Sequence, residues 1–197
     1  MRLLYDTCKR LFIDKTIFTL IYAIMKITTD RLILREFTLQ DTDRILEITK
    51  EDFILKWMPD WAMNREELAG LLNWYISCYA EPENMRTMLA ITEKSTSQVI
   101  GMIGCGHKAE VNDEVEMAYF ISEKYAGKGY MTEAASAFSK WVLENKKIEY
   151  LMAIVEPDNI PSEKIIKKCG FKKIRKIKIV NSGETEPKEF LYYRLYR

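Results

Sequence analysis

Three strand-like runs follow one another in the middle of the chain and are separated only by short polar turns. The runs are TMLAIT, VIGMIGCGHK and VEMAYFIS, and the turns are EKSTSQ and AEVNDE. Such spacing predicts an antiparallel meander of three strands. After it the apolar period changes from that of a strand to that of a helix in TEAASAFSKWVLENK, whose start Thr132 or the residue before it can cap. This order of elements predicts a fold in which helices and an antiparallel sheet are combined.

The segments before the meander predict one strand and two helices. DRLILREF alternates like a strand, and a helix follows that Thr38 or Asp41 can cap and that extends to about Lys50. FILKWMPDWAMN is rich in aromatic residues and contains a proline, so an irregular connection is expected there. Asn64 then caps a second helix, REELAGLLNWYISCYA.

The segments after the meander predict a strand, a helix and a closing pair of strands. YLMAIV has the composition of a buried strand, and in the next helix Pro161 lies in the first turn and Gly170 at the end. KKIRKIKIV and KEFLYYRLYR flank the turn NSGETEP. No internal repeat or low-complexity linker divides the chain, so we expect one α+β domain with a mixed, mostly antiparallel sheet of about six to seven strands and four helices.

The first 24 residues have a different pattern. The stretch MRLLYDTCKRLFIDKTIFTLIYAI is apolar, but Asp14 and Lys15 interrupt it before it is long enough to span a bilayer. Met25 opens the more regular pattern. We therefore expect an N-terminal extension over residues 1–24, a domain over residues 25–197, and no membrane partner.

Charge and cysteine content exclude several classes of function. The formal net charge is +1, which gives no argument for nucleic-acid binding. Cys8, Cys78, Cys105 and Cys169 form no C-x-x-C pair, and His107 is the single histidine. No metal site is expected from such a set, and reduced thiols favour a cytoplasmic protein.

Basic residues are in excess near the C-terminus. From Phe171 to Arg197 there are eight basic residues and three acidic ones. Such an excess can lie near a ligand that carries phosphate, but a solvated basic face is the simpler interpretation.

Two of the eight glycines, Gly127 and Gly129, lie one residue apart between the third strand and its helix. Free amides at a helix start can bind a phosphate, and glycine lets the main chain approach it closely. The plainer alternative is a tight turn that needs positive φ. A nucleotide-triphosphatase loop is absent because Lys128 is followed by Gly129, and a dinucleotide fingerprint would need glycine at Thr132.

The segment AGKGYMTEA resembles the acetyl-coenzyme A motif of the GNAT acetyltransferase superfamily, Q/R-x-x-G-x-G/A. The central glycine of the motif matches Gly129, whereas Ala126 and Met131 depart from it at either end. TDRLILREFTLQDTD and EMAYFIS resemble the first strand and helix and the fourth strand of the branch with ribosomal-protein alanine N-acetyltransferases. EPDNIPSEKIIKKCGF resembles its N-x-x-S … K-x-G-F segment, so the likeness extends from about Met25 to Arg197.

The resemblance implies that acetyl-CoA binds between two splayed parallel strands, EMAYFIS and LMAIVE. Main-chain amides of the glycine turn would receive the pyrophosphate, and main-chain groups of EMAYFIS would pair with the pantetheine amides, one of them stabilising the oxyanion. Asn159 would contact the pantetheine arm and Ser162 would lie near the sulfur. The implied cofactor-binding residues are Tyr119, Phe120, Ile121, Ala126, Gly127, Lys128, Gly129, Tyr130, Met131, Thr132, Asn159 and Ser162.

The reaction requires a neutral amine, so a base is useful. Glu116 is the candidate base, with an ordinary surface carboxylate as the alternative. In many relatives a tyrosine protonates the leaving thiolate, and this chain has Ile166 at that position. Ser162 is then the remaining candidate acid, unless the thiolate leaves without a protein acid. We expect His107 to lie at the surface, and Lys168 either near a phosphate or at the surface.

The resemblance also suggests where the acceptor binds. Trp57, Met58, Trp61 and Trp74 either line the acceptor wall or complete the core. No acidic cluster selects a polycation, so the expected acceptor is the amine of a peptide N-terminus or of a small molecule. The expected enzyme is an N-acetyltransferase that acts as a monomer or homodimer. The alternative is a non-catalytic acyl-CoA-binding or regulatory module.

Overall fold

The computed structural model describes residues 25–81, 83–180 and 185–197. The predicted extension over residues 1–24 and part of the predicted turn NSGETEP lie outside the described residues. Within the described part of the chain, no helix is both long enough and apolar enough to cross a membrane.

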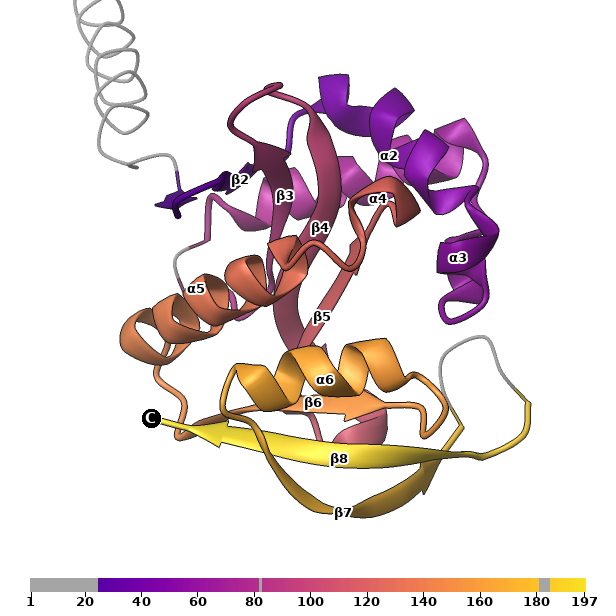
Figure 1. The fold of residues 1–197 in the computed structure, drawn as a ribbon, viewed down its shortest axis with the longest axis vertical. Helices are drawn as coiled ribbons and strands as arrows, with labels where there is room; N and C mark the ends of the chain where they lie inside the picture. Colours follow the sequence, from indigo (N-terminus) through magenta and orange to yellow (C-terminus); the bar gives the residue numbers. More distant parts are fainter. Residues whose placement is uncertain (1–24, 82, 181–184) are drawn as a thin grey trace, which may run out of the picture.

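Eight strands and five α-helices make up the described chain (Figure 1). The strands are β1 (Lys26–Thr28), β2 (Leu32–Glu36), β3 (Thr87–Glu93), β4 (Val99–Lys108), β5 (Glu114–Ile121), β6 (Tyr150–Val155), β7 (Lys172–Ile179) and β8 (Lys188–Tyr196). The helices are α2 (Thr42–Thr49), α3 (Asp52–Leu55), α4 (Arg65–Cys78), α5 (Tyr130–Asn145) and α6 (Ile160–Lys168). Short 3₁₀ turns lie between them, among them Pro59–Trp61 and Glu123–Tyr125.

All eight strands belong to one sheet in the order β1-β2-β3-β4-β5-β6-β8-β7. Every neighbouring pair is antiparallel except β5 and β6, which are parallel. Figure 1 shows that β6, β8 and β7 run across the direction of β5, so the sheet is bent where these two strands meet. The predicted α+β class, the meander and the closing strand pair are confirmed.

Two short elements depart from the prediction. β1 has three residues and pairs with β2, which is too short a run for alternation to reveal. α3 is a single turn at the start of the segment that we expected to be irregular. Glu51 before it is extended, which lets the chain leave α2 and re-enter a helix within two residues. The observed totals therefore exceed the predicted ones by a short strand and a short helix.

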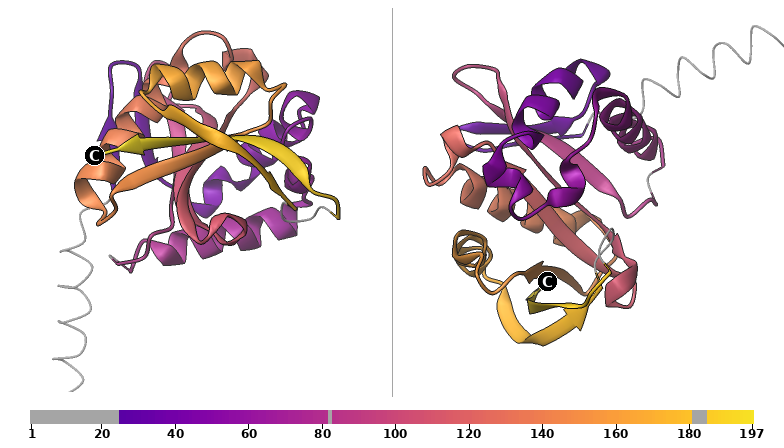
Figure 2. Two further views of the ribbon diagram at one scale, coloured as in Figure 1. Left: turned by 90° about the horizontal axis from the view of Figure 1, so that it is seen from below. Right: turned by 90° about the vertical axis from the view of Figure 1, so that its right-hand side faces the viewer.

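A small apolar cluster lies beside β6 and β8, and the sheet separates two larger apolar cores. One contains Phe138 of α5 and Ile166 of α6, both fully buried, and the other contains Ile45 of α2, Leu72 of α4 and Trp61. α5 and α6 therefore cover one face, and α2, α3 and α4 cover the other. Figure 2 shows the same division from two further directions.

Local sequence signals fix the ends of the helices beside the bend. The Asn64 side chain accepts a hydrogen bond from the amide of Glu67, and the Glu67 carboxylate accepts one from the amide of Asn64, so the predicted cap of α4 is confirmed as a capping box. In α6, Pro161 lies in the first turn, and Gly170 follows the last turn with φ +90°.

Candidate active site

The two parallel strands part shortly after they meet. Among the described residues, β5 and β6 are paired at Glu116 and Met152 alone. Beyond that point the strands diverge, and a cavity of about 370 Å³ opens between them. Residues from both strands line it, including Tyr119 of β5 and Ile154 of β6.

Register shows which main-chain groups of β5 face this opening. The Ser122 amide donates to the Ile100 carbonyl of β4 at 2.9 Å, and in an antiparallel pair such bonded positions alternate. Phe120 therefore directs its main chain toward β4. Tyr119 and Ile121 direct theirs toward β6, where the partner strand has moved away. Of the three main-chain contacts expected from the sequence, these two have the right direction.

The glycine turn between β5 and α5 takes left-handed main-chain angles. Gly127 has φ +72° and Gly129 has φ +82°, values that residues with a side chain rarely adopt. The helix begins at Tyr130 with Gly129 as its N-cap, so the expectation that Thr132 or Met131 would cap it is wrong. A left-handed glycine ends the turn earlier than a side-chain cap would.

Several amides at this turn precede the hydrogen-bond ladder of α5. The Glu133 amide donates to the Gly129 carbonyl at 3.0 Å, so the amides of Tyr130, Met131 and Thr132 come before the helix has carbonyls to offer them. They point out of the helix start together with the positive end of its dipole. The geometry of the turn is suited to an anion, and the pyrophosphate contact expected from the sequence stays a prediction.

Arg31 holds the turn from outside, which the sequence did not reveal. Its guanidinium donates to the Lys128 carbonyl at 3.0 Å, pairs with Glu133 at 2.7 Å and lies 4.3 Å from the centre of the Tyr130 ring. A Cβ atom on Gly129 would lie 3.4 Å from the Arg31 guanidinium. Since Arg31 comes from the loop before β2, about a hundred residues away, no local pattern could have indicated this contact.

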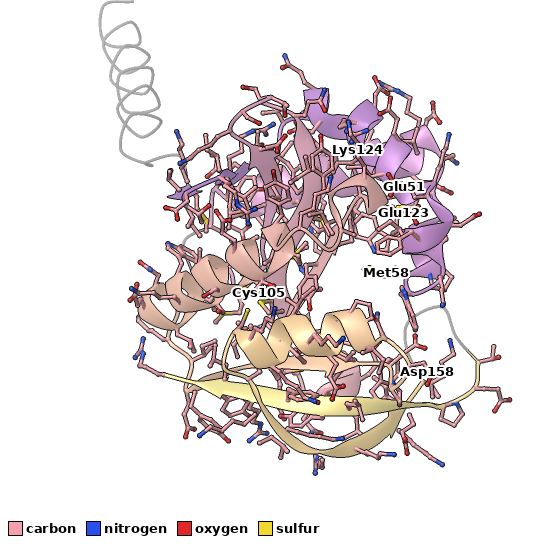
Figure 3. All side chains as sticks on the ribbon, viewed as in Figure 1. Glu51, Met58, Cys105, Glu123, Lys124 and Asp158 are labelled. Carbon is pink, nitrogen blue, oxygen red and sulfur yellow. The ribbon has the colours of Figure 1, made fainter. Side chains whose placement is uncertain are left out.

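Figure 3 shows a second link to the same region, in which Glu51 lies beside Glu123. The Glu51 carboxylate accepts hydrogen bonds from the Ser122 hydroxyl and the Glu123 amide, both at 2.7 Å. The connection between α2 and α3 is thereby tied to the end of β5. The start of the glycine turn is thus fixed from both sheet faces.

Asn159 and Ser162 meet at the start of α6. The Asn159 Oδ1 atom accepts a hydrogen bond from the Ser162 amide at 3.2 Å, which leaves its Nδ2 group for a ligand. The Ser162 hydroxyl lies 3.0 Å from the Tyr119 hydroxyl, and burial raises the pKa of Tyr119. Tyr119 is therefore a neutral phenol that reaches across the opening from β5 to α6. Sequence spacing gave no sign of this contact.

Glu116 lies in the cavity at the point where the strands part. Burial raises its pKa to about 7, Lys108 and Arg86 lower it, and Glu110 raises it. A carboxylate on a solvated strand face would keep a pKa near its ordinary value of 4.5. The environment is therefore that of an acid or base working near neutral pH.

The side chains of Cys105, His107 and Lys168 differ in how accessible they are to solvent. Burial raises the pKa of the Cys105 thiol to about 12, so it is a poor nucleophile. His107 is exposed at the end of β4, where its Nδ1 atom lies 2.7 Å from the Asp113 carbonyl, and its side chain borders the cavity mouth. Lys168 is exposed on the last turn of α6.

The aromatic residues expected at the acceptor wall separate into two groups. Trp57, Met58 and Trp61 line the cavity, and Trp61 packs edge-on against Phe120 with ring centres 4.9 Å apart. Trp74 lies outside the cavity lining and is 47% exposed. Figure 3 places Met58 on the α3 side of the opening and Asp158 on the α6 side.

Two glycines of β4 line the cavity. Gly104 and Gly106 of β4 lie opposite Ala118 and Glu116 of β5, on the sheet face that α2 to α4 cover. The Met88 side chain lies over Gly104, where an added Cβ would be 2.2 Å from its sulfur. The space above the two glycines is therefore occupied by neighbouring side chains, which lie across β4 beside Glu116.

The comparisons with known proteins agree with this geometry. Residues 31–172 match the family described as acetyltransferase (GNAT) domain. The chain belongs to this family. It is similar to the N-acetyltransferase YnaD of Bacillus subtilis (strain 168), with 27% identity over 149 residues that cover 76% of this chain and 84% of YnaD.

Solved structures place this GNAT acetyltransferase in the same fold. A GNAT-family acetyltransferase from Bacillus anthracis is 24% identical, covers 87% of this chain and 98% of its own, and superposes with a TM-score of 0.73. RimL, a ribosomal L7/L12 α-N-protein acetyltransferase solved with coenzyme A, is 16% identical, covers 87% of this chain and 98% of its own, and has the same TM-score of 0.73. The resemblance to the RimJ/RimL-like branch is therefore supported at the level of fold.

Proposed function

We propose that this acetyltransferase moves the acetyl group of acetyl-CoA to a primary amine by direct attack in a ternary complex. The observation that carries the proposal is the divergence of β5 and β6 after Glu116 and Met152, with the Gly129 turn at one end of β5 and Glu116 near the other. Two proteins of similar fold were solved with the donor or its product: MccE with acetyl-CoA and AMP, and RimL with coenzyme A.

The donor would extend along the open edge of β5. Its pyrophosphate would accept hydrogen bonds from the amides of Gly129, Tyr130 and Met131, and its pantetheine amides would pair with Tyr119 and Ile121. The Asn159 Nδ2 group would contact the same arm from α6. Ala126, Gly127, Lys128 and Thr132 complete the turn that we propose for the cofactor.

The acceptor would reach the thioester from the side of α2 to α4. Glu116 would take a proton from the ammonium group, so that the neutral nitrogen attacks the thioester carbonyl. A β5 amide that faces the opening would stabilise the oxyanion. When the C–S bond breaks, the nitrogen of the tetrahedral intermediate would lose its second proton, and that proton would reach the thiolate through the Ser162 hydroxyl or through water.

The residues proposed for the acceptor wall favour an amine with an apolar portion, since Trp57, Met58 and Trp61 line the cavity. A peptide N-terminus and a small-molecule amine both meet this description, and RimL is itself described as an α-N-protein acetyltransferase. We further propose a cytoplasmic protein that needs no metal.

The test is thiol release from acetyl-CoA with a panel of amines and peptides, with mass spectrometry of the products. We expect a mass gain of one acetyl group on at least one primary amine. Gly129→Ala should weaken acetyl-CoA binding, because the turn needs positive φ. Gly70→Ala, the same substitution in the middle of α4 with nothing within 4 Å, is the matched control. Acetyl-CoA binding without product on any acceptor would instead support a non-catalytic module.

A further inference from the structure

We infer that the acceptor carries an anionic group, in the simplest case a carboxylate, that pairs with Arg86 while its amine faces Glu116. The inference rests on the proposed function and narrows its substrate class to small amino-carboxylates with an apolar side chain. It is carried by the alignment of Arg86, which directly precedes β3, with Gly106 of β4 and Glu116 of β5.

The alignment follows from the register of the sheet. Gly106 of β4 is paired with Glu116 of β5, and Cys105 is paired with Thr87 of β3, which puts Arg86 beside Gly106 on its other side. Residues that lie opposite one another in antiparallel strands share a face. Arg86 and Glu116 therefore point to the same side of the sheet, with Gly106 between them.

Gly106 is what allows the arginine to lie across β4. A Cβ atom on Gly106 would lie 2.9 Å from the Arg86 Cζ atom and 3.0 and 3.1 Å from its two terminal nitrogens. The guanidinium thus occupies the space that a side chain at Gly106 would fill. Any larger residue there would displace the guanidinium from the row.

The other face of the guanidinium is held by an aromatic ring. Arg86 Cζ lies over the Trp74 ring, 4.8 Å from its centre, a cation–π contact that holds the guanidinium while its N–H groups remain able to donate hydrogen bonds. Trp74 does not itself line the cavity. It positions Arg86, which does line the cavity.

The positive charge of Arg86 has no carboxylate within ion-pair distance among the described residues. Lys108, the other cation at this end of the cavity, pairs with Glu110 at 3.6 Å. Arg86 also lowers the pKa of Glu116 from a distance, which a bound carboxylate would partly cancel. A planar guanidinium with open N–H groups matches a carboxylate through two parallel hydrogen bonds.

The other residues that line the cavity indicate the chemistry of the rest of the ligand. Two strand spacings separate the main chains of Arg86 and Glu116, about 10 Å, and both side chains reach inward. That leaves room for an amine and a carboxylate a few atoms apart. Trp61, Phe120 and Met88 line the same cavity, so an apolar side chain fits beside these polar groups.

The test compares three acceptors that share one side chain: phenylalanine, its amide and phenethylamine. The amide and the amine bracket the basicity of the amino acid, so preference for the acid reports on the carboxylate. We expect wild-type kcat/KM to be about 10- to 100-fold higher for phenylalanine, the range for a hydrogen bond to a charged group. Arg86→Gln should remove this preference mainly through KM, and Arg86→Lys should keep part of it.

Lys108→Gln is the matched control, because it removes the neighbouring cation, and it should keep the preference. A preference that survives Arg86→Gln, or that disappears in Lys108→Gln instead, overturns the inference. Turnover of phenethylamine with no preference for the acid also overturns it but leaves the proposed function intact. No thiol release with any amine would contradict the proposed function itself.

Calorimetry provides a readout that does not need turnover. With coenzyme A present, N-acetylphenylalanine should bind the wild type about 10-fold or more tightly than it binds Arg86→Gln. Equal binding to both proteins overturns the inference. Titration of coenzyme A alone should give the same affinity for both, which shows that the variant is folded and that the donor site is unchanged.

Discussion

At the scale of single residues, the chemistry depends on where each polar group is held. Glu116 is a carboxylate in a cavity between strands, and burial raises its pKa to about 7. Ser162 and Tyr119 touch one another across the same opening. The candidate base and the candidate proton donor therefore come from different elements, and the fold brings them to one site.

Glu116→Gln should lower kcat/KM by about 100-fold or more, since proton removal by a positioned base contributes at least that much. Wild-type activity should rise as pH increases through about 7, because Glu116 must be ionised to accept a proton. The variant should lack that rise. Rates of thiol release between pH 5.5 and 9 measure both effects, and an unchanged pH profile in the variant would exclude Glu116 as the base.

The same substitution should have the opposite effect on stability. The folded state raises the pKa of Glu116 from its ordinary value of 4.5 to about 7, so it favours the neutral form. The stabilisation that results is complete below pH 4.5 and is lost as pH rises through 7. Relative to wild type, Glu116→Gln should therefore gain thermal stability between pH 5 and pH 8. A difference in Tm that is independent of pH would contradict this.

At the scale of elements, glycines have opposite roles in two helices. Gly129 begins α5 with φ +82°, whereas Gly70 lies within α4 with open space around it. The first is required by the main-chain conformation, and the second only lowers helix propensity. Replacement by alanine should therefore change the free energy of unfolding in opposite directions at the two positions.

Gly129→Ala should lower the free energy of unfolding by about 1–2 kcal/mol because it places a Cβ atom in the left-handed region. Gly70→Ala should raise it by about 0.5–1 kcal/mol. Urea unfolding followed by circular dichroism measures both. Equal effects of the two substitutions would mean that the turn is not held as described.

Asn159 caps α6, and we propose that it also contacts the donor, two roles that substitution can separate. Its Oδ1 atom caps α6 through the Ser162 amide, and its Nδ2 group is available to the donor. Asn159→Ala should cost about 1 kcal/mol of stability and weaken acetyl-CoA binding. Asn159→Asp keeps the cap, so it should weaken binding with little loss of stability. Loss of stability in both variants, measured by urea unfolding, would contradict this separation.

Most elements could be predicted from the sequence because each has a local signal. The capping box at Asn64 fixed the start of α4, and Pro161 and Gly170 marked the ends of α6. The start of α5 was misplaced because a left-handed glycine replaced the side-chain cap. Arg31, Arg86 and the Tyr119 hydroxyl were missed because their partners are distant in sequence, and only the register of the folded sheet brings them together.

At the scale of the whole molecule, two parts of one sheet meet at a single paired position between β5 and β6. The cavity lies where the sheet is bent, and residues from both parts line it. A donor bound there as proposed would contact the Gly129 turn on one side and Asn159 on the other. Binding should therefore join the two parts and stabilise the whole chain.

Acetyl-CoA at 100 times its dissociation constant should add about 2.7 kcal/mol to the free energy of unfolding. For a chain of this size, that corresponds to a rise in Tm of about 5–10 °C. Differential scanning fluorimetry measures the shift. It should be largest for the wild type and smaller for Asn159→Ala, and no shift for the wild type would contradict binding across the opening.

The most direct test of the central claim is calorimetric titration of the full chain with acetyl-CoA, with Gly129→Ala and Gly70→Ala alongside. We predict saturable binding at one site per chain, weakened about 10-fold or more by Gly129→Ala and unchanged by Gly70→Ala. Absence of binding heat for the wild type, or equal affinity in all three proteins, would contradict the proposal that the amides of the Gly129 turn bind the pyrophosphate.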